Sequence, residues 1–379
     1  MVNLNLSTTV LLPALLAAGA TTTMVFSANN GMFAKITDMV DNPAITTMPG
    51  TDGAVPLTRE WTGMAAVDRQ FTVLLIFFWQ LLDGRHPAGT LQAAHFFGQM
   101  GAYWTLMQLE AKREGNKRRI IAYTTLIGLV YQNMSVAITI PLWCLAHLLT
   151  LPARPTSTTL TAALSIDPVE ARILPWAMTL GYILPSVAMA VPPHALALAG
   201  LPAQTQHYLA TAWQVFPFWI SLSSALILRP IFTTTTTTPP STTPAAAPTK
   251  PTTTTTAPVH LFALLLATIP HATTLALSST ASFFPSLFHP SLSASLHPTA
   301  VYLPRYSSPG GAPVPLATGV HRFLQWDEAI SSVASVVWAA TVYLRDTGTK
   351  GGESGTADSG IEEYFLLDMM KYIKPEIEV

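Results

Sequence analysis

The feature that most limits the fold of this chain is a series of apolar runs, each about as long as a membrane is thick. A helix rises about 1.5 Å per residue, so roughly 20 apolar residues cross a hydrocarbon core about 30 Å thick. Eight windows approach this length: residues 6–28, 63–82, 89–109, 120–151, 173–191, 207–228, 260–284 and 323–344. Because helices satisfy their own backbone polar groups in lipid, the pattern predicts an all-α fold, a polytopic transmembrane bundle of about seven or eight helices.

The composition agrees with a membrane setting. Half of the residues are hydrophobic and only 10% are charged, whereas about a quarter of the residues in a typical soluble domain are charged. Lys and Arg number 19 and Asp and Glu number 20, so no charge surplus points to a nucleic-acid partner. Membrane lipid is the expected surrounding. The single cysteine, Cys144, excludes an intramolecular disulfide and cannot make a thiolate metal site alone.

A Thr/Pro-rich stretch divides the expected bundle. Residues 1–232 carry helices one to six, and residues 259–345 carry helices seven and eight. Residues 233–258 lack the apolar side chains for a core, and their prolines lack amide donors, so we expect a disordered linker. Residues 346–379 form a polar tail. The first window also has the length of a signal peptide, but no Lys or Arg precedes it, which favours a retained helix.

A basic loop suggests how the bundle is oriented. The segment EAKREGNKRR, residues 110–119, carries five basic side chains, and short basic loops stay cytoplasmic. Residues 63–82 and 89–109 are joined by the short turn 83–87 and are expected to form a helical hairpin. Counting back from the basic loop places this turn and both chain termini on the opposite face. The endoplasmic reticulum membrane is the expected location.

Ionisable side chains inside lipid cost about 3 kcal/mol on insertion scales, so they are the strongest pointers to function. The candidates are Asp68, Arg69, Asp83, His95, Glu110, His147, Asp327 and Glu328. Each also has a structural interpretation. Asp68 can mark the membrane interface, Glu110 can pair with Arg113 three residues later, and histidines are more often satisfied core residues than ligands. Gln132 adds an uncharged hydrogen-bonding group at membrane depth.

Asp327 fits the structural interpretation least well. It stands between Trp326 and an apolar run, and removing a carboxyl group from water favours its neutral form. A neutral acid in an aromatic, apolar site can protonate a carbon–carbon double bond or an epoxide. Glu328 points about 100° away around the helix and keeps the interpretation of an anion at a helix N-terminus.

Aromatic residues and missing motifs narrow the chemistry. An aromatic face stabilises positive charge, which makes Trp326, Trp79 and Trp104 candidates for contact with a cationic intermediate, although tryptophans also form belts at membrane interfaces. The sequence has no DDxxD motif to hold magnesium on a diphosphate, and it has no HExxH motif and no phosphate-binding loop. We therefore expect no cofactor and no metal.

Six blocks, taken in order, resemble a known family: WTGMAAVDRQF, FFWQLLDGRHP, FFGQM, LEAKREGN, GLVYQNMSVAITIPLWCLAHLL and LQWDEA. The family comprises fungal polytopic membrane proteins and includes the membrane-bound terpene cyclases of the ascochlorin, ascofuranone and macrophorin pathways. The resemblance covers residues 61–151 and 323–344.

This resemblance implies a metal-independent enzyme of the isomerase or lyase type. Its substrate would be a lipophilic prenylated small molecule, a meroterpenoid precursor, cyclised after protonation of an epoxide or olefin. The resemblance implies Asp327 as the proton donor, with Asp68 and Glu110 as the other acids in matching blocks. The expected substrate-binding residues are Trp326, Trp79, Trp104 and Gln132.

A non-enzymatic polytopic protein, either a metabolite transporter or a scaffold, is the alternative. A transport path would spread polar side chains along the depth of several helices. Here the acids gather near the ends of the windows, which favours a site over a path.

Overall fold

The structure is a computed structural model that describes residues 4–51, 53, 55–151, 162–234, 256–306 and 312–347. Over these residues the secondary structure is helical apart from one isolated bridge, between Thr47 and Pro56, in the loop that precedes α5. The predicted all-α class is confirmed.

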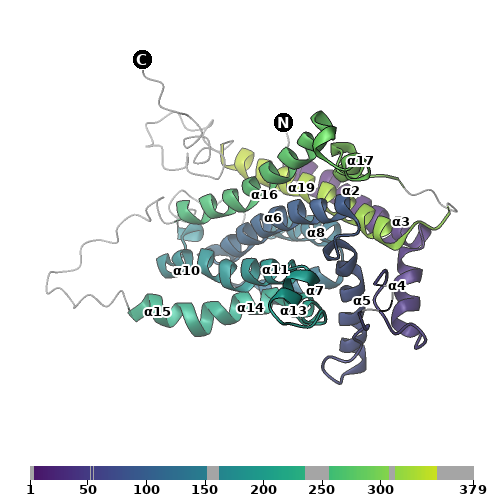
Figure 1. Ribbon diagram of the computed structural model, residues 1–379. Coiled ribbons are helices and arrows are strands. Elements are labelled where there is room, and N and C mark those ends of the chain that lie inside the picture. The colour runs from purple at the N-terminus through teal and green to yellow at the C-terminus, as the bar shows by residue number, and fades with distance from the viewer. Residues whose placement is uncertain are drawn as a thin grey trace, which may run out of the picture.

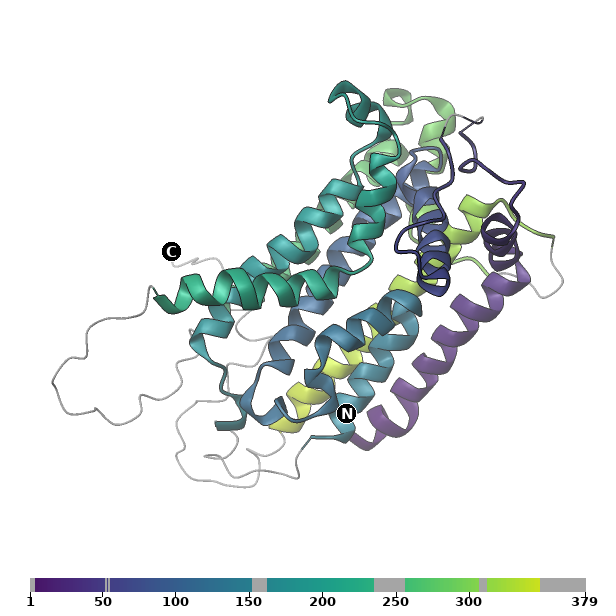
Figure 2. The same ribbon diagram turned by 90° about the horizontal axis from the view of Figure 1, so that it is seen from below.

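The centre of the molecule is a set of long helices that lie side by side (Figures 1 and 2). Helix α6 packs against α16 and α19, and α8 packs between α19 and the first helical run. These helices are α6 (Pro87–Ala111), α8 (Val136–Leu149), α16 (Ala257–Phe283) and α19 (Leu316–Thr347). The first run comprises α1 (Leu4–Leu6), α2 (Leu12–Gly19) and α3 (Phe26–Asn29), joined by wider π-helical turns.

A second group of helices packs against α6 and α7 (Figure 1). Its first part runs through α10 (Pro168–Met178) and α11 (Leu184–Met189) to the short α12 (Pro193–Leu198). Its second part returns through α13 (Thr205–Trp213), α14 (Phe216–Ser223) and α15 (Arg229–Thr234). Apolar packing explains the arrangement, because Trp213, Phe216 and Ile173 are fully or almost fully buried between the two groups.

The long helices have two ends, which we call the Arg119 end and the His86 end. At the Arg119 end, the first run and α19 meet where the hydroxyls of Ser7 and Thr341 lie 2.6 Å apart. At the His86 end, the rings of His86 and His321 lie 5.1 Å apart. Helices α6 and α19 therefore both run from the His86 end to the Arg119 end.

Residues 120–151 do not form one tilted span, as the sequence suggested. They form α7 (Thr124–Asn133) and α8, a hairpin whose turn lies inside the bundle. The Arg119 side chain donates to the Thr150 hydroxyl at 2.9 Å, so the hairpin enters and leaves at the same end. The break falls at Ser135, whose hydroxyl caps α8, because serine favours such caps over helix interiors.

Helix α5 (Ala65–Leu82) does not lie along α6, so the predicted helical hairpin is wrong. It crosses the His86 end beside α4 (Met32–Asp41) (Figures 1 and 2). Arg69 of α5 forms a salt bridge with Asp41 of α4 at 2.9 Å, and the Trp79 ring lies 5.2 Å from the His207 ring of α13. These contacts hold α5 across the end of the bundle.

The courses of α5 and of residues 120–151 change the expected positions of the chain ends. Because α5 runs across the bundle and residues 120–151 return to the end where they began, fewer segments pass from one end to the other than the windows imply. Residues Leu4 and Thr347, the first and last that the structure describes, belong to runs that meet at the Arg119 end. The ends of the described chain thus lie near the basic loop 110–119, whereas the sequence places the termini opposite that loop. The termini themselves, before Leu4 and after Thr347, lie outside the described residues.

Glycines allow two of the central helix pairs to approach closely. A Cβ atom on Gly98 of α6 would lie 2.6 Å from Pro270 Cγ of α16. A Cβ atom on Gly19 would lie 2.1 Å from the Ala137 carbonyl oxygen of α8. Small residues at such crossings are typical of helices that pack in membranes.

Four described helical segments are long and apolar enough to cross a membrane, judged by length and composition. They are Leu4–Asn29, Ala65–Leu82, Phe216–Thr234 and Ala257–Phe283. The expected total of seven or eight spans stays a prediction. The Thr/Pro-rich linker and the polar tail lie mostly outside the described residues, so the domain boundaries also stay predictions.

Candidate active site

Asp327 and Glu328 lie well inside α19 rather than at its start. Helix α19 begins at Leu316, about three turns before these acids. The interpretation of Glu328 as an anion at the N-terminus of its own helix is therefore wrong. Both side chains are nonetheless removed from solvent, with 3% of Asp327 and 7% of Glu328 exposed.

The Asp327 carboxyl closes the inner turn of the α7–α8 hairpin. Its Oδ1 accepts a hydrogen bond of 2.5 Å from the Ser135 hydroxyl and one of 2.7 Å from the Ala137 amide. Oxygen acceptors at this position satisfy amides that the first turn of a helix leaves unpaired. One acid thus fixes a turn that lies inside the bundle.

An aromatic cluster lies next to Asp327. Tyr131 lies in the last turn of α7, four residues before Ser135, whose hydroxyl binds the Asp327 carboxyl. The Tyr131 ring lies 5.4 Å from the Trp104 ring. Phe216 lies 5.6 Å from Trp104 and 5.0 Å from Tyr182. The cluster of Trp104, Tyr131, Tyr182 and Phe216 thus gathers four aromatic rings around the last turn of α7, next to the turn that Asp327 caps.

Several polar atoms in this region are buried without a hydrogen-bond partner among the described residues. They are the Trp104 indole nitrogen, the Tyr131 hydroxyl and the side-chain amide nitrogens of Gln108 and Gln132. Buried polar atoms normally find partners. Unpaired donors of this kind, on facing sides of α6 and α7, are expected where a ligand or water supplies the missing contacts.

The structure brings some predicted binding residues to this cluster but not others. Trp104 belongs to it, and Gln132 follows Tyr131 in α7. Trp79 lies against His207 instead. Trp326 donates from its indole nitrogen to the Arg305 carbonyl at 3.1 Å, with its ring 6.2 Å from the Phe26 ring.

Asp68 does not lie near Asp327. Its carboxyl accepts hydrogen bonds from the Thr62 amide and hydroxyl, each at 2.7 Å, and from the Gly63 amide at 3.1 Å. These contacts fix the loop that leads into α5, at the His86 end. The carboxyl stabilises amides that precede its own helix, in the manner of a capping residue.

Glu110 lies at the other end of the bundle. It pairs with the Arg113 guanidinium at 2.8 Å, and its other oxygen lies 3.9 Å from His147 Nε2. His147 stacks on Trp143 and accepts a hydrogen bond from the Trp338 indole at 3.0 Å. Glu110 lies about 22 Å along α6 from His95, a residue at the level of Glu328. Asp327, Asp68 and Glu110 therefore cannot act on one bond.

Glu328 takes part in a buried polar chain that sequence reasoning missed. Its carboxylate accepts a hydrogen bond from the Gln92 amide and forms an ion-pair contact with His95 Nδ1. His95 Nε2 lies 2.7 Å from His271 Nδ1 on α16, and His271 is exposed. The chain from Glu328 through His95 to His271 links an interior acid to the surface of the bundle.

A signal for this chain exists in the sequence of α6. Gln92, His95, Gln99 and Tyr103 are spaced by three and four residues, so they share one face of the helix. A polar stripe in an otherwise apolar helix marks a face that meets other polar groups. Tyr103 continues this stripe, with its hydroxyl 2.5 Å from the Ser332 hydroxyl of α19.

Comparison with known proteins identifies relatives of the chain. The family model described as the CtvD domain matches residues 8–363. Terpene cyclase ascI of Acremonium egyptiacum is 28% identical over 334 residues, which cover 87% of this chain and 78% of that protein. Terpene cyclase ctvD of Aspergillus terreus is 28% identical over 297 residues, covering 76% and 74%.

A third relative, terpene cyclase janA of Penicillium janthinellum, is 28% identical over 336 residues, covering 87% and 81%. No solved structure matches the chain. The resemblance to fungal terpene cyclases inferred from the six sequence blocks is confirmed. The match extends over much more of the chain than residues 61–151 and 323–344.

Proposed function

Because this chain belongs to the family defined by the CtvD domain, we propose that it is an integral membrane terpene cyclase of secondary metabolism. Its substrate is a prenylated, meroterpenoid-type molecule, and the reaction begins with protonation of an epoxide or olefin. Its relatives carry the name terpene cyclase, and its long apolar helices suit a substrate that enters from the bilayer. The endoplasmic reticulum is the proposed location.

The observation that carries this proposal is the burial of Asp327 beside the aromatic cluster. Asp327 donates its proton to the epoxide oxygen as the carbon–oxygen bond breaks. The π electrons of an internal double bond then form the new carbon–carbon bond. Trp104 and Tyr131 stabilise the carbocation through their ring faces. Asp68 and Glu110 hold the two ends of the bundle and take no part in the chemistry.

The reaction ends when the carbocation loses a proton to a base. Glu328 is the proposed base, since its carboxylate is buried and linked to His95. His95, whose Nδ1 contacts the Glu328 carboxylate, can share this proton, and the next cycle begins after the proton returns to Asp327. One proton is delivered and one is removed, so the product is an isomer of the substrate.

Replacing Asp327 by Asn tests the acid separately from the fold. Asn retains an oxygen that caps a helix N-terminus well, but it has no acidic proton. In microsomes supplied with an epoxyfarnesyl phenol, the wild type should give a cyclised product of unchanged mass, and Asp327→Asn should lower turnover about 10²- to 10⁴-fold. Product formation is measured by chromatography and mass spectrometry, with and without a metal chelator. The chelator should leave product formation unchanged.

Asp38→Asn is the matched control, because Asp38 is exposed on α4. It should turn over at the wild-type rate. Undiminished product from Asp327→Asn would remove this residue as the donor. Passage of a labelled metabolite across proteoliposomes without chemical change would instead favour the transporter.

A further inference from the structure

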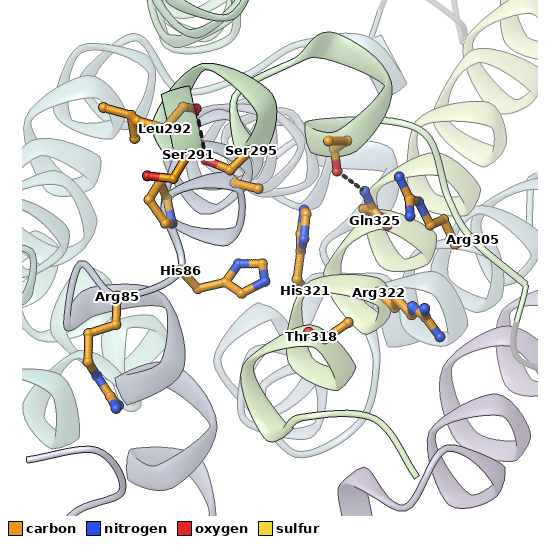
Figure 3. Close-up of a pocket in the computed structure, with 13 residues that line it drawn as sticks. Arg85, His86, Ser291, Leu292, Ser295, Arg305, Thr318, His321, Arg322 and Gln325 are labelled. Atoms are coloured by element: carbon orange, nitrogen blue, oxygen red, sulfur yellow. Dashed lines mark hydrogen bonds between the residues drawn. The ribbon is translucent and has the colours of Figure 1, made fainter. Parts of the chain in front are cut away.

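A basic pocket of about 520 Å³ opens at the His86 end of the bundle. It lies between the turn that precedes α6, the short helices α17 (Pro290–Ser295) and α18 (Pro298–Val301), and the start of α19 (Figure 3). Its lining includes the polar side chains of Arg85, His86, Arg305, His321, Arg322 and Gln325.

The charge of this basic pocket is not balanced. Three arginines line it, and no Asp or Glu is among its described lining residues. Arg85 pairs with Asp83 and points away from the two histidines (Figure 3). Arg322 Nε is buried and has no hydrogen-bond partner among the residues that the structure describes. A buried guanidinium donor without a partner is costly, and an anion would remove this cost.

The two histidines add a donor that faces the same space. His86 Nδ1 accepts a hydrogen bond from the Gly89 amide at 3.0 Å. Burial lowers the pKa of His86, so the ring is neutral near pH 7 and carries its proton on Nε2. The His86 ring points toward the His321 ring across the pocket (Figure 3), so its remaining N–H is directed inward.

The far wall of the basic pocket is held in place by hydrogen bonds between α18 and α19. The Gln325 amide donates to the carbonyls of Ala300 and Val301 at 3.0 and 2.8 Å. His321 Nε2 lies 3.0 Å from the Val301 carbonyl oxygen. These bonds fix the backbone around the pocket, so a ligand need not order it.

We propose that the basic pocket binds the anionic head of an amphiphile, a carboxylate or a phosphate, through Arg322, Arg305 and His86. Planar guanidinium groups bind both kinds of anion well. During turnover the head belongs to the substrate, a step that rests on the proposed function. Helix α19 rises about 9 Å from His321 to the level of Asp327. His321 and Glu328, seven residues apart, share one face of α19, so a prenyl tail anchored here runs along that face to the level of the two acids. A phospholipid headgroup offers the same chemistry.

Equilibrium binding tests the site without any need for turnover. The full chain is placed in nanodiscs of phosphatidylcholine and given a tritiated farnesyl hydroxybenzoic acid or its methyl ester. Wild type should bind the acid more tightly than the ester, and Arg322→Gln should weaken acid binding roughly 10- to 100-fold, as expected for charged hydrogen bonds. Ester binding should not change. Arg172→Gln, an exposed arginine on α10, should behave as wild type.

A lipid measurement separates the two sources of the anion. If the ligand is a lipid headgroup, native mass spectrometry should show phosphatidic acid retained by wild type and lost from Arg322→Gln, while acid and ester bind alike. Arg305→Gln, at an exposed position, provides a second variant should Arg322→Gln fail to fold. The proposal is overturned if wild type prefers neither the acid nor phosphatidic acid relative to the variants. Asp327→Asn should still bind the acid, which distinguishes failure of catalysis from failure of this site.

Discussion

Asp327 and Glu328 are neighbours in sequence but serve different helices. Asp327 meets the start of α8, and Glu328 meets α6, because successive residues point about 100° apart around a helix. A proton donor and a terminal base can therefore sit side by side in the chain without sharing one environment. This separation gives each acid its own test.

Replacing Glu328 by Gln tests the base. Gln keeps an oxygen that can accept from Gln92, so the fold should be retained, but it cannot take up a proton at neutral pH. We expect turnover to fall at least about 10²-fold, with the same decrease in His95→Ala. The measurement is the initial rate with the epoxyfarnesyl phenol, together with the ratio of olefin to hydrated product. An unchanged rate and ratio in Glu328→Gln would show that another group removes the proton.

Groups that are unusual in lipid could be predicted from the sequence, whereas groups whose importance depends on a distant partner could not. Asp327 and Trp104 stand out in sequence because a carboxyl or an indole contrasts with an apolar run. Tyr131 does not stand out, since only the fold brings the last turn of α7 and the following Ser135 to Asp327. The same holds for His271, which lies 176 residues from His95 in sequence.

At the scale of elements, the tight packing of α6 against α16 can be tested at their crossing. A methyl group on Gly98 would lie 2.6 Å from Pro270 Cγ and 2.7 Å from the Leu266 carbonyl oxygen. A proline ring and a backbone carbonyl can move little, so Gly98→Ala should destabilise the protein by about 1–3 kcal/mol. Thermal unfolding with a thiol-reactive dye measures this, because the only cysteine, Cys144, is buried.

Ala94→Leu provides the control for that crossing. Ala94 is exposed on the same helix, so a larger side chain there should change the free energy of unfolding by no more than about 0.5 kcal/mol and leave the unfolding midpoint close to that of the wild type. Equal midpoints for Gly98→Ala and wild type would mean that α6 and α16 do not approach as closely as the structure places them.

It was easier to predict which segments form helices than to predict the direction in which each helix runs. The apolar windows anticipated most of the long helices, because composition and length determine which segments can be helical in lipid. They misjudged residues 120–151 and α5, since mean hydropathy does not record where a chain turns back. The Asn133–Met134–Ser135 segment was the local signal for the turn, because asparagine and serine favour helix ends.

At the scale of the whole molecule, the path of the chain makes a prediction about sidedness that differs from the one drawn from sequence. The Arg119 end holds the basic loop together with the start of the first run and the end of α19. The short helix α12 connects α11 to α13 at the opposite end, where His207 of α13 lies against Trp79 of α5. Asn5 and the basic loop should therefore face the same side of the membrane, and α12 should face the other.

Cysteine labelling tests this sidedness, since the chain needs only Cys144→Ala to become free of thiols. Single cysteines are then placed at Asn5, Lys117 and Leu198, all exposed, and intact microsomes are treated with a membrane-impermeant maleimide. Because short basic loops stay cytoplasmic, Asn5→Cys and Lys117→Cys should react at once, and Leu198→Cys only after detergent is added. Immediate labelling of Leu198→Cys, with Asn5→Cys protected until detergent is added, would contradict the path of the chain and restore the topology in which residues 120–151 cross the membrane.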